Sequence, residues 1–286
     1  MRIYDCFMFY NEFDLLEIRL KELYDHVDLF VIVESNLSHT NNPKPFRFEQ
    51  HKERYLPWID KIRYIKHVSN ASSNPWTNET AQRLAISQGI QDSHENDIVI
   101  ISDLDEIVRH NVVQELRQDF TNTIYGFHMP LFNFKFNFMR VDPGPHDVWA
   151  MAARAGWLKR FTPQELRNLK HNLFNTVPDC RLLNHKEIRV FAHGGWHFGY
   201  LGNNKWLLEK ANNNCHQEDI TEEFLQQLDV EKSIQEKKCW NRAWPYRYEI
   251  VDLDSYFPTS CRDYPQHCLP NSGISAQDIL EQHDAR

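Results

Sequence analysis

An acidic turn follows the clearest strand pattern in the chain. Residues 97–102 read Asp-Ile-Val-Ile-Ile-Ser and continue into Asp103-Leu-Asp105. Two carboxylates at a strand end point into one crevice, where they can hold a hard divalent cation and leave positions open for phosphate oxygens. The spacing alone is weakly specific, because aspartates also cap helices and a second pair, Asp252 and Asp254, lies near a Pro- and Cys-rich tail. The buried context favours Asp103 and Asp105 as metal or nucleotide ligands and solvated turn acids at the second pair.

A glycine-rich segment at 193–202 is the other unusual run. It reads His193-Gly-Gly-Trp-His197-Phe-Gly-Tyr-Leu-Gly and contains four of the nine glycines. Dense glycine lets backbone approach a ligand closely, and an imidazole beside carboxylates suits a borderline cation such as Mn²⁺. The alternative is a glycine-rich turn with a tryptophan in the core and His197 hydrogen-bonded internally. The two interpretations are nearly balanced.

The first hundred residues alternate between strand and helix patterns. Asn11 is a candidate N-cap for the first helix, in which apolar residues recur at helical spacing. The predicted order is a strand at 3–9, a helix at 11–25, a strand at 29–33, a helix at 78–90 and a strand at 97–101. This order predicts an α/β fold whose mostly parallel central sheet is covered on both faces, with ligands beyond the carboxyl ends of the strands.

The second half of the chain is less regular. Extended segments are expected at 123–138 and 187–201, and helices at 163–173, 203–213 and 221–238. We expect one domain over 1–286, with a nucleotide-binding half at 1–110, a half at 111–250 that completes the acceptor and metal sites, and an irregular tail at 251–286.

Composition and charge limit the kinds of molecule that the protein is expected to bind. The chain has 286 residues, of which 41% are hydrophobic and 25% charged, an ordinary globular balance. The 32 basic and 40 acidic residues give a net charge of −8 without a basic stripe, which argues against nucleic acid. No stretch has the apolar length that spans a bilayer.

The six cysteines contain no C-x-x-C pair, which argues against a zinc ribbon or a thioredoxin-type centre. Cys261 and Cys268 could form a bridge, but free thiols in a reducing compartment are the preferred interpretation. The expected location is therefore the cytoplasm.

Several of these segments together resemble glycosyltransferase family 17, whose known members are β-1,4-N-acetylglucosaminyltransferases. The resemblance spans roughly residues 3–220, and its opening block is the most specific part. It is carried by Asp5-Cys-Phe-Met-Phe-Tyr-Asn-Glu-Phe-Asp-Leu-Leu-Glu-Ile-Arg-Leu20, Val31-Ile-Val-Glu-Ser35, Gln82-Arg83, Asp97-Ile-Val-Ile-Ile-Ser-Asp-Leu-Asp-Glu-Ile107 and Gly195-Trp-His197.

The resemblance implies a GT-A type fold, a UDP-N-acetylglucosamine donor, a divalent metal (Mn²⁺ or Mg²⁺) and inversion at the anomeric carbon. Asp103 and Asp105 match the family's metal and nucleotide motif, and His197 matches a late metal ligand. Arg83 falls at an arginine that could contact the diphosphate, although an exposed helix arginine is the plain alternative. Glu34 falls where such folds hold the nucleoside, although a solvated strand-end acid would look the same.

A carboxylate must take the proton from the acceptor hydroxyl as it attacks the sugar. The candidates are Glu218, Asp219 and Asp147, with Glu218 slightly preferred because His216-Gln-Glu resembles bacterial relatives; each taken alone resembles a surface acid or cap. Lys205 is a candidate second phosphate contact, and a solvated helix lysine is an equal alternative. At most one tryptophan is expected to contact sugar, from Trp149, Trp157, Trp196 and Trp206.

Two other functions compete with a transferase. A metal-dependent phosphohydrolase would use the same ligands to activate water but usually gathers more of them. A non-catalytic carbohydrate-binding protein would bind sugar whether or not a chelator is present. Animal family members carry an N-terminal membrane anchor, whereas this sequence begins at the first strand, so a bacterial or viral type of enzyme is expected.

Overall fold

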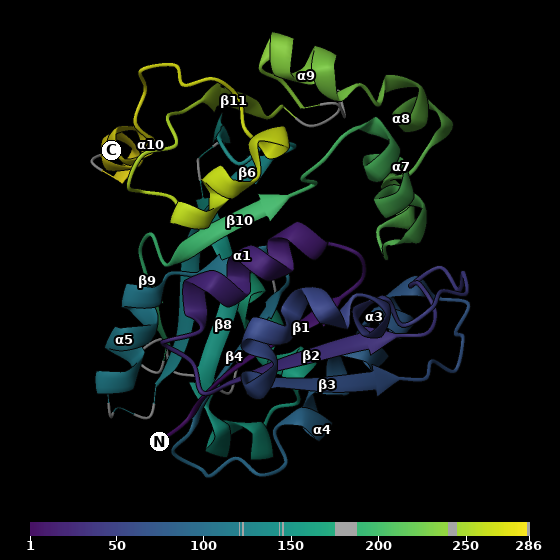
Figure 1. The fold of residues 1–286 in the computed structure, drawn as a ribbon, viewed down its shortest axis with the longest axis vertical. Helices are drawn as coiled ribbons and strands as arrows, with labels where there is room; N and C mark the ends of the chain where they lie inside the picture. The colour runs from purple at the N-terminus through teal and green to yellow at the C-terminus, as the bar shows by residue number, and fades with distance from the viewer. Residues whose placement is uncertain are drawn as a thin grey trace.

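The structure is a computed structural model that describes residues 1–119, 121, 123–142, 144, 146–174, 188–239 and 245–284. Within these ranges the side chains of His146, residues 172–174 and Asp219 are not described. The described strands form one eleven-stranded sheet, with helices packed against it (Figure 1). Among the described residues, no helix combines the length and apolar character needed to cross a bilayer.

The strands are β1 (Ile3–Phe9), β2 (Leu29–Ser35), β3 (Ile62–His67), β4 (Ile98–Asp103), β5 (Glu106–Val108), β6 (Ile124–Asn133), β7 (Phe138–Asp142), β8 (His146–Arg154), β9 (Ile188–Phe191), β10 (Gly195–Gly199) and β11 (Arg247–Ile250). The α-helices are α1 (Phe13–Leu23), α2 (Arg47–Gln50), α3 (Pro75–Leu84), α4 (Ile86–Gly89), α5 (His110–Gln118), α6 (Pro163–Asn168), α7 (Asn204–Asn213), α8 (Glu222–Gln227), α9 (Val230–Glu236) and α10 (Ala276–Asp284). The 3₁₀ segments are η1 (Lys52–Lys61), η2 (Ala155–Lys159), η3 (Leu169–Phe174), η5 (Gln217–Asp219), η6 (Thr259–Asp263) and η7 (Pro265–His267).

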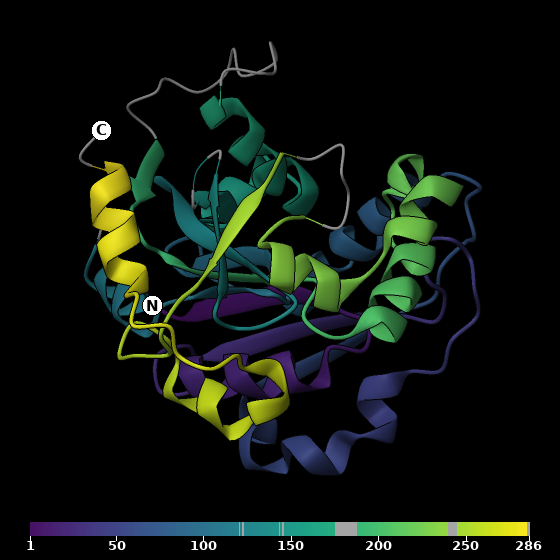
Figure 2. The ribbon, with the colours of Figure 1, turned by 90° about the horizontal axis from the view of Figure 1, so that it is seen from above.

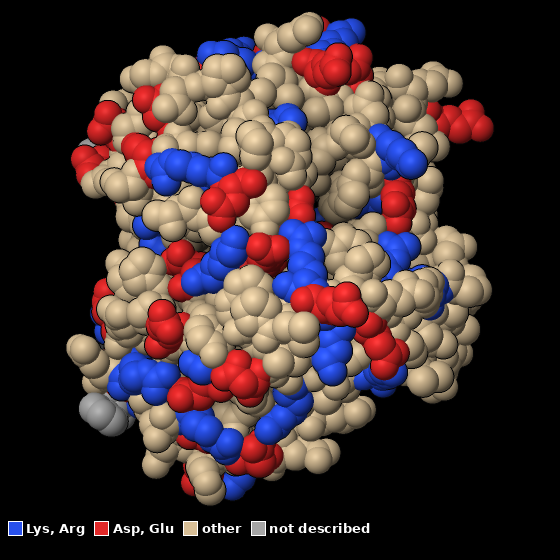
Figure 3. Space-filling model, in the orientation of Figure 1, with Lys and Arg blue, Asp and Glu red and all other residues tan. Residues whose placement is uncertain are grey.

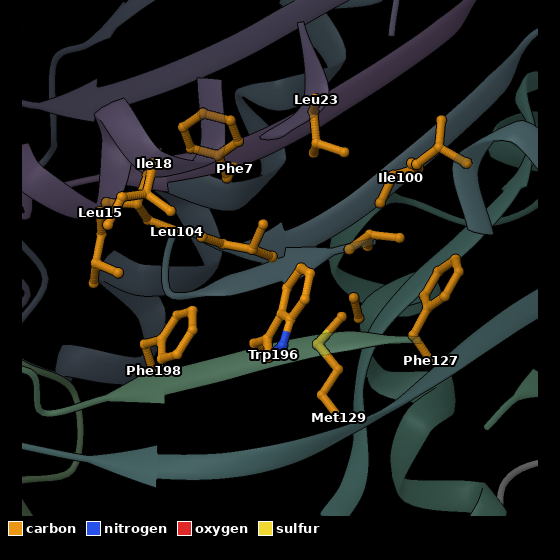
Figure 4. Packing of buried hydrophobic residues seen from close by; sticks show 14 of the residues in the cluster. Phe7, Leu15, Ile18, Leu23, Ile100, Leu104, Phe127, Met129, Trp196 and Phe198 are labelled. Atoms are coloured by element: carbon orange, nitrogen blue, oxygen red, sulfur yellow. The ribbon is translucent and has the colours of Figure 1, made fainter. Parts of the chain in front are cut away.

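The N-terminal half is a parallel sheet in the order β3-β2-β1-β4. Successive side chains of a strand point to opposite faces, and both faces of these strands are buried, so the strands read as continuous apolar runs. One face packs against α1 and η1 through Phe7, Phe9, Phe30, Ile32 and Ile100. Figure 4 shows Phe7 and Ile100 in this core together with Leu15, Ile18 and Leu23 of α1. The other packs against α4 and α6 through Tyr4, Cys6, Val31, Val33 and Ile101. The α/β class predicted from the sequence is confirmed.

The sheet continues from β4 into antiparallel strands. β8 pairs antiparallel with both β4 and β6, and β7 and β11 extend the sheet beyond β6. β10 lies between β5 and β6, antiparallel to the first and parallel to the second. A Cβ on Gly195 would lie 2.1 Å from the carbonyl oxygen of Ile107, so glycine is what lets β10 approach β5 here.

The C-terminal segment packs back onto the first helix. In Figure 2 the tail runs beside α1, and Lys21 of α1 pairs with Asp263 of η6 at 3.0 Å. Tyr256, Phe257, Cys261, Tyr264 and Leu280 share one hydrophobic core with residues of β1 and α1. The tail is less irregular than expected, because it includes two 3₁₀ turns and ends in α10.

The first half follows the expected order of elements, with two corrections. Strand β3 was not expected, because it lies at the sheet edge and its side chains are half-buried, which dilutes the apolar signal. The predicted cap at Asn11 is wrong. The N-cap of α1 is Glu12, and the Asn11 side chain instead donates to Glu209 on α7 at 3.0 Å.

Several elements are shorter than their sequence patterns suggested. The helix expected at 78–90 is divided into α3 and α4, and the one at 163–173 ends at Asn168 and continues as a 3₁₀ turn. The segment 221–238 forms two helices because the Asp229 side chain accepts from the backbone N–H of Lys232 and caps a new one. The extended segment at 123–138 breaks after β6, where Phe134 adopts a φ of 65°.

Candidate active site

A cavity of about 500 Å³ opens at the carboxyl edge of the parallel strands. Its wall is built by residues that follow β1, β2 and β4, together with β8, β10, α3, α6 and α7. Open parallel sheets bind ligands at this edge, where neighbouring loops diverge. On the face drawn in Figure 3, basic and acidic side chains are interleaved over the surface.

Asp105 and His197 face one another in this cavity. β10 pairs antiparallel with β5, so His197 lies opposite Glu106, next to the acidic turn. His197 Nε2 lies 3.7 Å from Asp105 Oδ1, and the two side chains are only 13% and 11% exposed. Burial lowers the pKa of His197, which favours the neutral ring with a free lone pair.

Lys210 of α7 contacts the other oxygen of the same carboxylate. Its Nζ lies 2.9 Å from Asp105 Oδ2. Burial alone would raise the pKa of Asp105, but Lys210 and then His197 outweigh it, and the pKa lies below its ordinary value. Asp105 is therefore ionised, with Oδ2 bound to an ammonium group and Oδ1 directed toward an imidazole.

The pair formed by Asp105 and His197 fits a divalent cation. The 3.7 Å separation is too long for a hydrogen bond, and a carboxylate oxygen and an imidazole nitrogen are both ligands of Mn²⁺. Among the residues that the structure describes, no group of three His, Cys, Asp or Glu side chains is gathered as a metal site. A cation held by two protein ligands would complete its coordination with water and substrate phosphate oxygens, which is the usual arrangement for Mg²⁺.

Asp103 has different partners. Arg83 Nη2 donates to Asp103 Oδ1 at 2.9 Å and Arg167 Nη2 to Oδ2 at 3.0 Å. Burial alone would raise the pKa of Asp103, but Arg167 and Arg83 hold it well below the ordinary value. The structure thus brings Asp105 and His197 together and places the carboxylate of Asp103 on two guanidinium groups.

Arg167 and Lys170 are functional candidates that the sequence reasoning missed. Both line the cavity from the continuous helical segment formed by α6 and η3. Burial, and then Arg167, lower the pKa of Lys170 to about 8. Its ammonium lies 5.2 Å from the centre of the Trp149 ring. Two basic residues at i and i+3 in the helix expected at 163–173 were the available signal.

Glu34 is enclosed by protein donors. Its carboxylate accepts from Lys44 Nζ at 2.6 Å, from Tyr64 Oη at 2.8 Å, and from the backbone N–H groups of Arg47 and Phe48 at 2.7 and 3.0 Å. The side chain is fully buried and is not part of the cavity wall, which Lys44 lines instead. These contacts hold the loop after β2; the expected nucleoside contact stays a prediction.

Of the other expected site residues, Asp147 lines the cavity, whereas Glu218 and Lys205 do not. Asp147 of β8 lines the cavity, with its Oδ2 accepting from Arg140 Nη2 at 2.6 Å. Glu218 is exposed, lies outside the cavity wall and pairs with His216 at 3.4 Å. Asp219 lies in η5, with its side chain outside the described residues. Lys205 is exposed on α7 and outside the cavity wall, whereas Lys210 of the same helix lines it.

Among the four tryptophans considered, Trp149 lines the cavity. Its ring meets the His197 ring edge-on, with centroids 4.2 Å apart. Trp157 and Trp196 are 5% and 2% exposed and belong to the hydrophobic cores. Trp76, which the sequence did not single out, is 40% exposed and also lines the cavity, so it is a candidate surface for stacking on a ring.

Residues 1–154, more than half of the chain, match the sequence model of glycosyltransferase family 17. The chain belongs to glycosyltransferase family 17. The match includes the acidic turn at 103–105, whereas His197, Arg167 and Lys210 lie beyond it, so their place in the site rests on the tertiary structure. Residues of this family 17 chain that meet in the cavity thus come from both sides of position 154.

Two curated relatives of this family 17 chain are similar over about two thirds of its length. Beta-1,4-mannosyl-glycoprotein 4-beta-N-acetylglucosaminyltransferase from Rattus norvegicus is 28% identical over 220 residues, which is 68% of this chain and 39% of the relative. The protein of the same name from Homo sapiens is 24% identical over 211 residues, 65% of this chain and 38% of the relative. The aligned region therefore spans under two fifths of the length of these relatives.

A solved structure shows a distant likeness. It is the mannosyltransferase PcManGT from Pyrobaculum calidifontis in complex with GDP-Man and Mn²⁺, which is 12% identical. The superposition covers 99% of this chain and 73% of that one with a TM-score of 0.42.

Proposed function

We propose that this chain is a metal-dependent, inverting glycosyltransferase. The donor that we propose is UDP-N-acetylglucosamine, from which the sugar is moved to a hydroxyl group of a glycan acceptor. The single observation that carries the proposal is that the largely buried side chains of Asp105 and His197 face each other in a cavity at the carboxyl edge of the parallel strands. The family and the names of the relatives support a sugar transfer and the choice of sugar.

Asp105 and His197 are the residues that we propose hold the cation, Mn²⁺ or Mg²⁺. When bound, it supplies positive charge against the diphosphate that departs with the nucleotide. The ammonium of Lys210 keeps Asp105 ionised and fixes the orientation of its carboxylate, because it occupies Oδ2 at 2.9 Å. Burial keeps His197 neutral, which is the form that binds metals.

Asp147 is the base that we propose among the three carboxylates considered, because it lines the cavity whereas Glu218 does not. The acceptor oxygen forms a bond to the anomeric carbon as the bond from that carbon to the phosphate oxygen breaks. Asp147 takes the hydroxyl proton, and the electron pair of the broken bond leaves with the nucleotide diphosphate. Arg140 orients the carboxylate through Oδ2 and leaves Oδ1 for the proton.

The state of the cysteine thiols is relevant to the cellular compartment in which the protein works. Cys6, Cys215, Cys261 and Cys268 are free thiols, and all but Cys268 are buried; Cys180 lies outside the described residues. Free thiols are typical of a reducing compartment, and the cytoplasm remains the location that we propose.

The test combines binding and transfer. We expect the melting temperature to rise with UDP or UDP-N-acetylglucosamine when Mn²⁺ is present and to rise much less with EDTA, because a ligand that binds only the folded state stabilises it by mass action. Asp105→Asn should remove the Mn²⁺-dependent shift and the transfer of sugar, whereas Asp25→Asn, an exposed carboxylate in the turn after α1, should leave both unchanged.

Three other results would contradict the proposal. Release of phosphate from simple phosphoesters without a sugar acceptor would favour a phosphohydrolase. Glycan binding that is unaffected by EDTA and by Asp105→Asn, without transfer, would favour a carbohydrate-binding protein. Full transfer activity of Asp105→Asn would remove the metal assignment.

A further inference from the structure

Hydrogen-bond donors and acceptors are unbalanced around Asp103. All four oxygens of Asp103 and Glu106 are engaged: Arg83 and Arg167 bind the two oxygens of Asp103, Arg167 also binds Glu106 Oε1 at 2.5 Å, and the backbone N–H of Asp103 binds Glu106 Oε2 at 2.8 Å. Glu79 takes a further contact from Arg83 Nη2 at 2.8 Å. Each oxygen of Asp103 and Glu106 therefore already accepts a hydrogen bond from within the chain.

Some N–H donors of the two arginines have no acceptor among the described residues. Arg167 makes these contacts through Nη2 alone, and its Nε and Nη1 are buried without a hydrogen-bond partner in the described part of the chain. Within the same part of the chain, Arg83 Nε is likewise buried without a partner. Both arginines are 2% exposed and both line the cavity. A buried N–H group without an acceptor is costly, and the cavity that both arginines line can admit one.

Lys170 adds a third cation to the same wall. It lies three residues after Arg167, and its charge interacts with those of Glu106 and Asp103. Guanidinium N–H donors beside an ammonium are a common means by which proteins bind phosphate oxygens, because several donors can converge on one tetrahedral group. A phosphate group, unlike a neutral sugar hydroxyl, also carries the negative charge that attracts an ammonium.

We propose that Arg83, Arg167 and Lys170 form an anion subsite that binds a phosphate group of the donor diphosphate without the metal. In this arrangement Asp103 is a positioning residue that holds the two guanidinium groups in place. The two acids of the Asp-x-Asp motif therefore have separate tasks, with Asp105 at the cation and Asp103 at the anion subsite. This inference rests on the proposed function for the identity of the anion.

The test measures anion and cation binding separately. Pyrophosphate is titrated by calorimetry in EDTA, and Mn²⁺ is titrated by electron paramagnetic resonance without nucleotide. We expect Lys170→Gln to lower pyrophosphate affinity about tenfold or more, as expected for the loss of a charge-assisted contact, and to leave Mn²⁺ affinity unchanged. Lys159→Gln is the matched control, because it removes an equal charge from a lysine that is 70% exposed and outside the cavity wall.

Substitution of Asp103 and of Asp105 is expected to affect anion binding and cation binding in opposite ways. Asp103→Asn should lower pyrophosphate affinity and keep Mn²⁺ affinity, whereas Asp105→Asn should do the reverse. Circular dichroism and melting curves identify a variant that fails to fold, in which case Lys170→Gln alone decides the question.

If the wild type does not bind pyrophosphate in EDTA, or if Lys170→Gln binds it normally, the anion subsite is wrong. Loss of Mn²⁺ binding in Asp103→Asn would make Asp103 a metal ligand. Mn²⁺-dependent sugar transfer by the wild type would survive either result, so the two proposals fail separately.

Discussion

Arg19 of α1 and Asp5 of β1 form an ion pair with no exposed surface directly behind the acidic turn. Arg19 Nε donates to Asp5 Oδ2 at 2.7 Å, and Nη2 also donates to Ser102 Oγ at 2.6 Å. The remaining nitrogen, Nη1, reaches three backbone carbonyl oxygens of the turn, those of Asp103 at 2.9 Å, Leu104 at 3.2 Å and Glu106 at 3.0 Å. One side chain of α1 therefore fixes the backbone from which both site aspartates project.

Arg19→Met should destabilise the fold strongly. The variant leaves the charge of Asp5 buried without a partner and removes the donor to three carbonyls, so we expect a loss of about 3–5 kcal/mol in the free energy of unfolding. Urea denaturation followed by fluorescence measures it. Lys21→Met, on the same helix with a lysine 32% exposed, is the control and should change stability by about 1 kcal/mol or less. Equal effects of the two substitutions would mean that the buried ion pair does not hold the turn.

Asp147→Asn should act on the chemical step. If Asp147 is the base, the substitution removes proton transfer, and we expect kcat to fall by about 100-fold or more while KM for the donor changes little. Steady-state kinetics at saturating acceptor measures the two constants. A melting temperature close to that of the wild type would show that loss of the contact with Arg140 is not the cause.

The competing base is tested in the same assay. Glu218→Gln should retain most of kcat, because Glu218 is exposed and outside the cavity wall. A large fall in kcat for Glu218→Gln, with near-normal activity of Asp147→Asn, would restore the order of candidates that the sequence suggested.

Acid should loosen the attachment of the C-terminal tail to α1. Asp14 Oδ2 lies 2.9 Å from His267 Nε2, and Arg54 Nη2 donates to Oδ1 at 2.7 Å. The hydrogen bond to His267, together with Arg54, lowers the pKa of Asp14 to about 2 from an ordinary 3.8. Since the folded-state pKa is depressed, this contribution to stability is complete above pH 3.8 and is lost as the pH falls through 2.

Asp14→Asn should remove that part of the acid dependence. We expect a loss of about 1 kcal/mol at neutral pH, because the partners are only partly buried, and a smaller difference from the wild type at pH 2. Urea unfolding at pH 6 and at pH 2 measures both. An unchanged gap between wild type and variant at the two pH values would show that Asp14 does not titrate with folding.

The sequence by itself determined the N-terminal architecture and the position of the acidic turn. Apolar runs in β1, β2 and β4 are readable because these strands are buried on both faces, and a turn that follows a central strand must emerge at the carboxyl edge of the sheet. Most segments that carry the resemblance to family 17 lie in this part, so the membership and the choice of Asp105 both came from local pattern. The same patterns missed β3, whose edge position leaves it half-buried.

Only the tertiary structure decided what each charged side chain does. Arg167 reaches Asp103 across 64 residues of sequence, and Lys210 reaches Asp105 across 105. Glu34 and Lys205 stay predicted ligand contacts, and the structure places both outside the cavity wall, the first with its carboxylate bound by the loop that follows β2. Hydrogen-bond partners are set by which elements pack together, and that packing depends on the whole core. Spacing along the chain could therefore locate the acids of the site, whereas their division between a cation and an anion subsite depends on the arginines and lysines that folding brings to them.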